Sequence, residues 1–169
     1  MAATLTVKTC DGKVFHIIKE VIDTSKMLKD MVEDLDDLND MIKSGKKEPE
    51  EPAILELSEK VLEQVTLFCC NFAVTPIPPI PPVAPDHDHV NVTKWDEDFF
   101  NPLSHEELEA IILAANFLDN KPLLEVSCKI MANRIKGLPF DTVVKMLKLE
   151  AMEPDKLQAF KKEHEMTLK

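Results

Sequence analysis

Polar and apolar residues alternate near the start of the chain, in Thr-Leu-Thr-Val-Lys at residues 4–8. A period of two predicts a half-buried β-strand. Residues 14–18, Val-Phe-His-Ile-Ile, predict a second strand, and the turn signal Asp11-Gly12 lies between the two. The sequence therefore predicts an N-terminal β-hairpin.

Helical spacing replaces this alternation between residues 25 and 35, where apolar side chains recur three or four positions apart. After Leu35 charged residues dominate, through Asp40 and Lys43 as far as Glu51, and this charged stretch predicts a loop. Residues 52–57 predict a short strand, and Ser58 is expected to cap a helix. The apolar face of that helix contains Val61, Leu62, Val65, Phe68, Cys69 and Phe72. Strand, strand, helix, strand and helix in this order predict a small α/β unit.

The most clearly marked helix begins at Ser104, which forms the capping-box pattern S-x-x-E with Glu107. This helix has apolar residues on two sides. One side is an ordinary core stripe of Leu108, Ile111, Ile112, Ala115 and Leu118. Leu113, Asn116 and Phe117 fall on a different side. Periodicity allows two interpretations of that second side, a surface for a partner or a helix that is buried on most sides.

Two further helices are predicted downstream. Asn120 and Pro122 mark the start of the first, which ends at Gly137. It carries two apolar stripes, one made of Leu124, Cys128, Met131 and Ile135 and the other of Leu123, Val126 and Ile130. Pro139 or Asp141 starts the next helix, which contains Val143, Val144, Met146 and Leu147. A last, weaker helix is expected after Pro154, with Leu157 and Phe160 as its apolar residues.

Between residues 74 and 93 the chain holds six of its twelve prolines, which predicts an extended loop or linker. Pro76-Ile77-Pro78-Pro79 fits the P-x-x-P pattern of SH3 ligands, but basic residues do not flank it, so a spacer is preferred. Asp86-His87-Asp88-His89 offers metal-ligating side chains without further ligands nearby in sequence. A solvated polar linker is therefore the preferred interpretation, and neither a metal nor another cofactor is expected.

The composition narrows the possible functions. The chain has 169 residues, 44% of them hydrophobic, which suits one soluble domain with an appended helical piece. With 31 acidic and 20 basic residues its net charge is -11, which disfavours binding to nucleic acid or to anionic membranes. No apolar run reaches the roughly 20 residues that span a bilayer, and no secretory signal is expected. The four cysteines form no C-x-x-C pair, so reduced thiols inside the cell are expected.

Four motifs follow one another in the second half of the chain. They are Trp95-Asp96 with Phe99, Leu113 to Asp119, Leu123 to Lys129, and Ala132-Asn133 with Ile135-Lys136-Gly137. In this order and spacing they resemble the S-phase-kinase-associated (Skp) family, the adaptor subunits of SCF ubiquitin ligases. Weaker similarity extends to Asp11-Gly12 and Phe15 near the N-terminus.

The resemblance implies an α+β, BTB/POZ-type fold followed by C-terminal helices. Residues 1–73 would form the first part of the BTB/POZ-type domain, 74–93 its Pro-rich loop, 94–137 the remaining helices and 138–169 the F-box-binding extension. It also implies a non-catalytic adaptor, cytoplasmic and nuclear, that joins a cullin N-terminal domain to F-box proteins.

The family's sites can be carried over to individual positions. The family's Asn-aromatic pair, which faces the cullin, corresponds to Asn116 and Phe117, and Leu113 shares their side of the helix. The F-box-facing positions correspond to Leu124, Cys128, Met131, Ile135, Val144 and Leu147. For each of these residues an ordinary core contact is the alternative interpretation, and for Cys128 and Met131 it has nearly equal weight.

Some positions depart from the family pattern. Phe117 stands where the family usually has Tyr, and loss of a hydroxyl hydrogen bond would cost about 0.5–1.5 kcal/mol. Glu109 replaces an aromatic residue, which predicts altered self-association or partner choice, with a weak homodimer as one outcome. The F-box-facing end also differs, because the helix start is shifted to Leu138-Pro139-Phe140-Asp141 and the family's W-C-E-E tail is absent.

Three other functions are alternatives to this one. An Elongin C-like adaptor would share the first domain but lack helices after Pro139. A scaffold that self-assembles through the same apolar faces belongs to a different class. An enzyme is the least favoured, because a phosphate-binding Gly-rich loop, G-x-S-x-G and H-E-x-x-H are all missing from the sequence.

Overall fold

The computed structural model describes residues 5–43, 52–74, 92–148, 155–156, 158–159 and 162. The chain divides into two compact units, Met1–Lys129 and Ile130–Lys169. The first unit combines a three-stranded sheet with helices, and the second contains the end of one helix and a further short helix.

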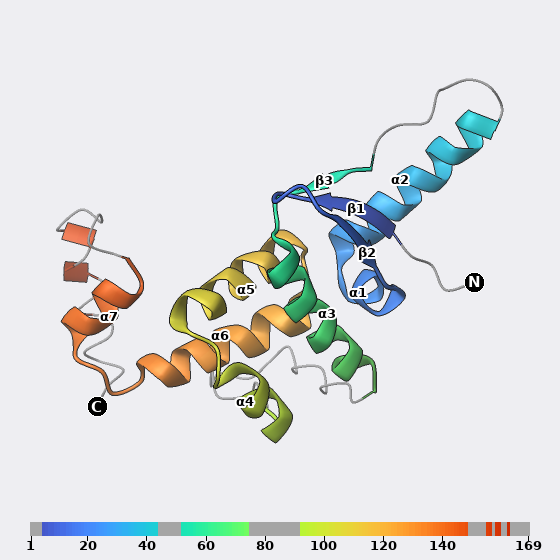
Figure 1. Ribbon diagram of the computed structural model, residues 1–169. Helices are drawn as coiled ribbons and strands as arrows, with labels where there is room; N and C mark the ends of the chain where they lie inside the picture. The colour runs from blue at the N-terminus through green and yellow to red at the C-terminus, as the bar shows by residue number, and fades with distance from the viewer. Residues whose placement is uncertain are drawn as a thin grey trace, which may run out of the picture. The chain divides into compact units, whose positions relative to one another are not determined.

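The sheet has the strand order β2-β1-β3 and is built from β1 (Leu5–Thr9), β2 (Val14–Ile17) and β3 (Ile54–Leu55) (Figure 1). β1 pairs with β2 in antiparallel register, with Leu5 opposite Ile17, which confirms the predicted hairpin. β3 pairs with β1 in parallel, with Thr9 opposite Leu55. The hairpin turn requires Gly12 because its φ of 80° lies in the left-handed region.

One face of the sheet is buried and the other is open to solvent. Leu5, Val7 and Thr9 are buried on β1, while Thr6 and Lys8 between them are exposed. This is the alternation that the sequence predicts, and it places the apolar side of the hairpin against the helices.

Seven helices occur in the described part of the chain. They are α1 (Lys19–Thr24), α2 (Lys26–Lys43), α3 (Glu59–Val74), α4 (Lys94–Phe100), α5 (His105–Phe117), α6 (Lys121–Ile135) and α7 (Phe140–Met146). Within the first unit α1 packs against α2 and α3, and α3 packs against α5. The core residues of α3 are Leu62, Val65, Phe68 and Cys69, which confirms most of its predicted apolar face.

Two local predictions need correction. The charged stretch after Leu35, which was expected to be a loop, is helical as far as Lys43, because α2 spans Lys26–Lys43. Leu38, Met41 and Ile42 continue the helical apolar spacing through this charged stretch, and Lys and Glu are themselves good helix formers. The short helix α1 was not predicted, although its Val21 and Ile22 are buried.

α6 crosses from the first unit into the second, and Gly137 with a φ of 79° follows its end, as the sequence predicts. α7 begins after Pro139 and buries Val143 and Val144. Asp155, Lys156, Gln158, Ala159 and Lys162 are helical, in agreement with the predicted last helix. Its apolar residues Leu157 and Phe160 lie outside the described residues, as do the Pro-rich segment 75–91 and its Asp-His repeat.

Candidate protein-interaction surfaces

Asn120, between α5 and α6, is fully buried and holds three parts of the chain together. Its side-chain amide donates to the Thr24 hydroxyl at 3.0 Å and to the Cys69 sulfur at 3.4 Å. Its carbonyl oxygen accepts from the Leu123 backbone N–H at 3.2 Å and so caps α6. The turn after α5 is therefore fixed to α1 and α3, and burial raises the pKa of the Cys69 thiol.

The same turn is anchored to the start of α2. The Ser25 hydroxyl donates to the Leu118 carbonyl and accepts from the Leu28 backbone N–H at 3.1 Å. Asp119 has a φ of 49°, the left-handed conformation that ends α5. These bonds fix the C-terminal end of α5, where the predicted cullin-facing residues lie.

The N-terminal end of α5 is closed by the capping box that the sequence predicts. The Glu107 backbone N–H donates to the Ser104 hydroxyl at 3.2 Å, and the Ser104 backbone N–H donates to the Glu107 carboxylate at 2.9 Å. Lys60 on α3 forms an ion pair with that carboxylate. The Lys60 ammonium, followed by the Ser104 N–H, lowers the pKa of Glu107 from 4.5 to about 2.

α5 has a buried side and an exposed side. Leu108, Ile111, Ala115 and Leu118 are buried, which confirms four of the five core residues predicted for this helix, and Ile112 is half-buried. Leu113 is 62% exposed and Phe117 is 43% exposed. Asn116 is exposed as well, so the three predicted cullin-facing residues share one open surface.

A shallow apolar groove of about 230 Å³ lies between the N-terminal halves of α3 and α5. Its apolar part is lined by Val61 of α3, by Leu103 just before α5, and by Ala110 and Ile111 of α5. The Lys60–Glu107 ion pair lies beside it. Ala110 precedes Leu113 by three positions and Phe117 by seven, so the groove adjoins the exposed side of α5.

The stripe of α6 that the resemblance assigns to F-box contacts is only partly open. In the first unit Leu124 is half-buried and Cys128 is exposed, although partial burial of its thiol raises the thiol pKa. In the second unit Ile135 is half-buried, whereas Met131 is only 8% exposed. The opposite stripe, Leu123, Val126 and Ile130, is buried. The helical spacing of the apolar residues does not by itself tell which of the two stripes of α6 is buried within the fold.

The two assigned positions at α7 also differ from each other. Val144 is 8% exposed and Leu147, which caps the helix, is half-buried. Met131 and Val144 therefore expose little side-chain surface in this structure.

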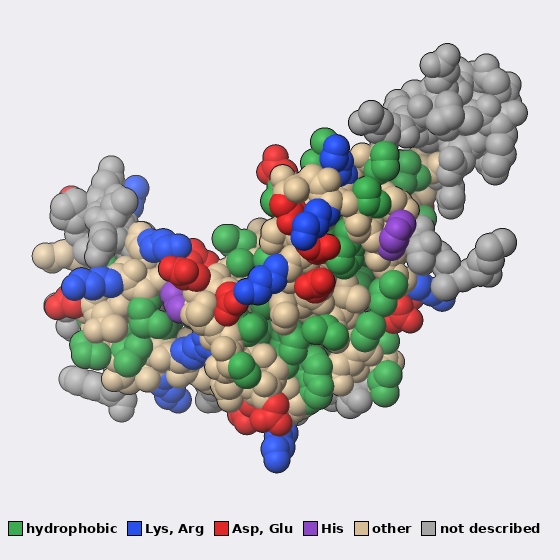
Figure 2. All heavy atoms as spheres, viewed as in Figure 1, with side chains coloured by type: hydrophobic (Ala, Val, Ile, Leu, Met, Phe, Trp, Pro, Cys, Tyr) green, Lys and Arg blue, Asp and Glu red, His purple; other side chains and the backbone are tan. Residues whose placement is uncertain are grey.

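Some exposed apolar residues were not singled out from the sequence. Ile54 on β3 and Leu67 on α3 both have large exposed fractions. Each lies in an element whose other face is core, so the sequence signal was present as a second apolar side, as on α5. Figure 2 shows hydrophobic side chains gathered over α3 on the face it displays.

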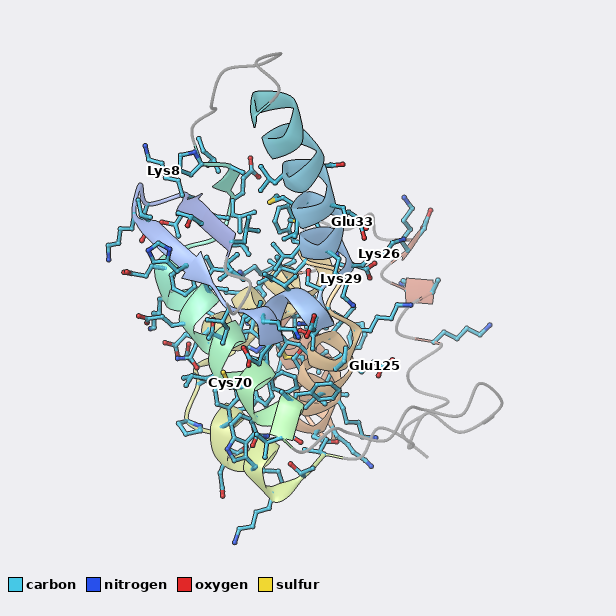
Figure 3. The ribbon with its side chains drawn as sticks, turned by 90° about the vertical axis from the view of Figure 1, so that its right-hand side faces the viewer. Lys8, Lys26, Lys29, Glu33, Cys70 and Glu125 are labelled. Atoms are coloured by element: carbon cyan, nitrogen blue, oxygen red, sulfur yellow. The ribbon has the colours of Figure 1, made fainter. Side chains whose placement is uncertain are left out.

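Charged residues cover other parts of the surface. Figure 3 shows Lys26, Lys29 and Glu33 along α2, Glu125 on α6 and Lys8 on β1. Among the described residues, no group of three His, Cys, Asp or Glu side chains is placed to hold a metal ion. No helix in the described ranges has the length and apolar character that a membrane span requires.

Comparison with known proteins adds independent evidence. Residues 3–73 match the model of the Skp1 family, tetramerisation domain. The chain is 34% identical to the E3 ubiquitin ligase complex SCF subunit sconC of Emericella nidulans, over 98% of this chain and 97% of that protein. It is 29% identical to the SCF ubiquitin ligase complex protein SKP1a of Dictyostelium discoideum, over 94% of this chain and 91% of that protein. The POZ-type α+β fold is confirmed, and the chain belongs to the Skp1 family.

Proposed function

We propose that this chain is the adaptor subunit of an SCF-type E3 ubiquitin ligase, joining a cullin scaffold to F-box substrate receptors. Relatives that match it over nearly their whole length are named as SCF complex subunits. The observation that carries the proposal is the exposed side of α5, where Leu113 and Phe117 project from a helix whose opposite side is core. A partner can bind this surface without disturbing the fold.

The cullin contact is assigned to Leu113, Asn116 and Phe117. Two apolar side chains around one amide provide hydrophobic area together with a hydrogen-bonding group, as protein interfaces commonly do. Both ends of α5 are fixed, by the capping box at Ser104 and by the buried bonds of Asn120. The surface is therefore organised before binding, and less conformational entropy is lost when a partner docks.

The F-box contact is assigned mainly to Leu124, Cys128, Ile135 and Leu147, the members of the family's set that keep accessible surface. Met131 and Val144 are assigned a supporting role, because both are only 8% exposed. They would hold the neighbouring contact residues in place from within the second unit.

In this proposal the adaptor holds its two partners in place and carries out no chemical step. Holding a substrate receptor and a cullin in one assembly raises the local concentration of substrate near the ubiquitin-transfer machinery. Each of the two interfaces should bury about 1,600 Å² of surface, counted over both partners, if the complex is stable. Rigidity of the adaptor is the property that this mechanism requires.

Calorimetric titration of the chain against a cullin N-terminal domain and, separately, against an F-box fragment tests the proposal. Saturable binding to both partners is expected. Binding to neither would remove the adaptor function. The oligomeric state of the chain is measured by sedimentation at several concentrations. A concentration-dependent oligomer that excludes the F-box fragment would instead support the self-assembling scaffold.

A further inference from the structure

A second shallow groove lies at the start of α2, beside the turn between α5 and α6, and is called the α2 groove below. Its volume is about 450 Å³. It is lined by Lys26, Met27, Asp30, Met31 and Asp34 of α2 and by Asp119 of the turn. All of these residues belong to the first unit. The contacts assigned to the cullin and to F-box proteins above use none of these side chains.

Hydrogen bonds hold the two walls of the α2 groove together. The Lys26 backbone N–H donates to the Asp119 carbonyl at 3.4 Å. One residue earlier on each wall, the Ser25 hydroxyl donates to the Leu118 carbonyl. Asp119 has a φ of 49°, and Asn120 beside it is fixed by its buried bonds. The groove is therefore organised in the free chain, and little conformational entropy is lost when a partner docks there.

The floor of the α2 groove is apolar. Met27 and Met31 lie one helical turn apart on α2, and both are half-buried. Methionine side chains are flexible and polarisable, so they adapt to partner groups of different shape. Leu28, next to Met27, is fully buried in the core, which keeps this part of α2 in place.

The rim of the α2 groove is acidic. Asp30 and Asp34 lie one helical turn apart on α2, Asp119 lies on the other wall, and all three are exposed. Among the residues that the structure describes, none of the three forms an ion pair. Lys26, labelled in Figure 3, is the one positive charge among the lining residues. The groove therefore carries an excess of negative charge that the chain itself does not neutralise within its described part.

The α2 groove adjoins the proposed cullin contact. The Asp119 backbone N–H donates to the Asn116 carbonyl at 3.1 Å, and Phe117 lies two positions before Asp119 in the chain. The side chains of all three residues are exposed. A partner that covers Asn116 and Phe117 therefore has the Asp119 carboxylate, and with it one wall of the groove, at the edge of its contact.

An acidic rim around a methionine floor suits a basic partner. Arg and Lys side chains can place their charged heads between carboxylates while their aliphatic stems pack on apolar groups. The net charge of -11 attracts such a partner from a distance. A second copy of this chain is the wrong occupant, because its own groove and its net charge have the same sign.

We propose that the α2 groove extends the cullin contact beyond α5 and binds Arg or Lys side chains of the cullin N-terminal domain. This inference rests on the adaptor function proposed above. It adds Asp30, Asp34 and Asp119 to the residues that select the partner. The apolar side chains of α5 supply buried area, whereas the carboxylates of the groove speed association and discriminate against partners that lack the matching positive charge.

Calorimetric titration of full-length variants against a cullin N-terminal domain, at low and at physiological salt, tests this inference. The triple variant Asp30→Asn, Asp34→Asn, Asp119→Asn removes the charges of the rim, and Asn tolerates the left-handed conformation of Asp119. Its affinity at low salt should fall by at least about fivefold. Its binding should also depend less on salt than that of the unmodified chain. Urea unfolding should show little change in stability, because the three side chains are exposed.

The charge-matched control is Glu63→Gln, Glu97→Gln, Asp98→Asn. It removes three negative charges as well, at exposed positions of α3 and α4 outside the groove. Its affinity for the cullin domain should stay within about twofold of that of the unmodified chain. Lys26→Gln is a second variant with the opposite expected effect, because it removes the positive charge from the groove and should tighten binding.

Failure of this inference can be told apart from failure of the adaptor function. If the unmodified chain binds the cullin domain and the groove variant binds it with equal affinity and equal salt dependence, the α2 groove is not part of the contact. Equal weakening in the groove variant and in the charge-matched control would assign the effect to net charge and would overturn the inference too. If the unmodified chain does not bind the cullin domain, the adaptor function itself is refuted, and the inference with it.

Discussion

Phe117 and Leu118 are neighbours in sequence with opposite environments, because a helix turns about 100° between successive residues. Phe117 is 43% exposed, whereas Leu118 is fully buried. The last turn of α5 therefore separates a side chain available to a partner from one that the fold requires. Mutations at these two positions should have effects of different kinds.

The double variant Asn116→Ala, Phe117→Ala should lose binding to a cullin N-terminal domain and keep its stability. Both side chains are exposed, so their removal takes away little buried area. Calorimetry gives the affinity and urea unfolding gives the stability. Leu118→Ala, the matched core control, should lower the free energy of unfolding by about 2–5 kcal/mol. If the double variant unfolded instead, the exposed side of α5 would have to be part of the core.

Asn120→Ala should destabilise the chain through lost hydrogen bonds. The substitution removes the donor to Thr24 and Cys69 and the cap of α6, all at a buried site. A loss of about 1–3 kcal/mol in the free energy of unfolding is expected, measured by urea denaturation. Asn116→Ala, an exposed change of the same chemistry, is the control. Equal stability of the two variants would contradict the structural role of Asn120.

At the level of elements, helices with both a strong apolar period and a cap could be predicted from sequence. Ser104 and Glu107 gave the start of α5, and the spacing after them gave its core stripe. α1 was not predicted because a helix of six residues contains too little periodicity. The end of α2 was misplaced because charge was taken as a loop signal, although charged side chains are compatible with an exposed helix.

The candidate surfaces could also be predicted only in part from the sequence. The exposed side of α5 could be predicted because its neighbouring stripe already accounted for the core. On α6 both stripes are apolar, and only tertiary packing decides that Leu123 and Val126 are buried while Cys128 is exposed. The burial of Met131 and Val144 could not be read from spacing for the same reason. Thr93 and Asp96 form a capping box at the start of α4. It was not predicted, because it has Asp at the third helical position, where the pattern recognised for α5 has Glu.

The N-terminus of α5 should show a pH-dependent contribution to stability. The pKa of Glu107 is about 2 in the folded chain and 4.5 without its partners, so folding favours the ionised form. The stabilisation is present above pH 4.5 and is lost as the pH falls from there toward 2. Glu107→Gln should therefore reduce the pH dependence of the unfolding free energy in this range, measured by urea titrations at several pH values.

Glu106→Gln provides the control for that experiment, since it removes one exposed charge from the same turn without breaking the capping box. Its pH dependence should stay closer to that of the unmodified chain. A profile for Glu107→Gln that matched the unmodified chain would show that the carboxylate is not held by Lys60 and Ser104 in solution.

For the whole molecule, the two proposed contacts use different parts of the chain. The cullin contact lies on α5, while the F-box contact lies on α6, at Leu124, Cys128 and Ile135, and at Leu147 after α7. The two partners should consequently bind together, and changes at one surface should leave the other affinity unaltered.

A pair of variants measures this independence. Leu147→Ala should weaken binding of an F-box fragment and leave the cullin affinity within about twofold, because Leu147 is half-buried and belongs to the second unit. The Asn116→Ala, Phe117→Ala variant should show the reverse. Titration of each partner in the presence and absence of the other completes the comparison. Mutual exclusion of the two partners would contradict the assignment of the two contacts to different residues.

The bonds of Asn120 also have a consequence for the order in which the chain acquires its structure during synthesis. The amide reaches Thr24 across 96 residues of sequence and Cys69 across 51. Residues 3–73, the part that matches the family model, contain both acceptors but not the donor. When this segment leaves the ribosome, Phe68 and Cys69 still lack the helix α5 that packs on α3. We therefore expect that the matched segment does not fold by itself, and that its apolar surface stays open to chaperones until the turn at Asn120 has been made.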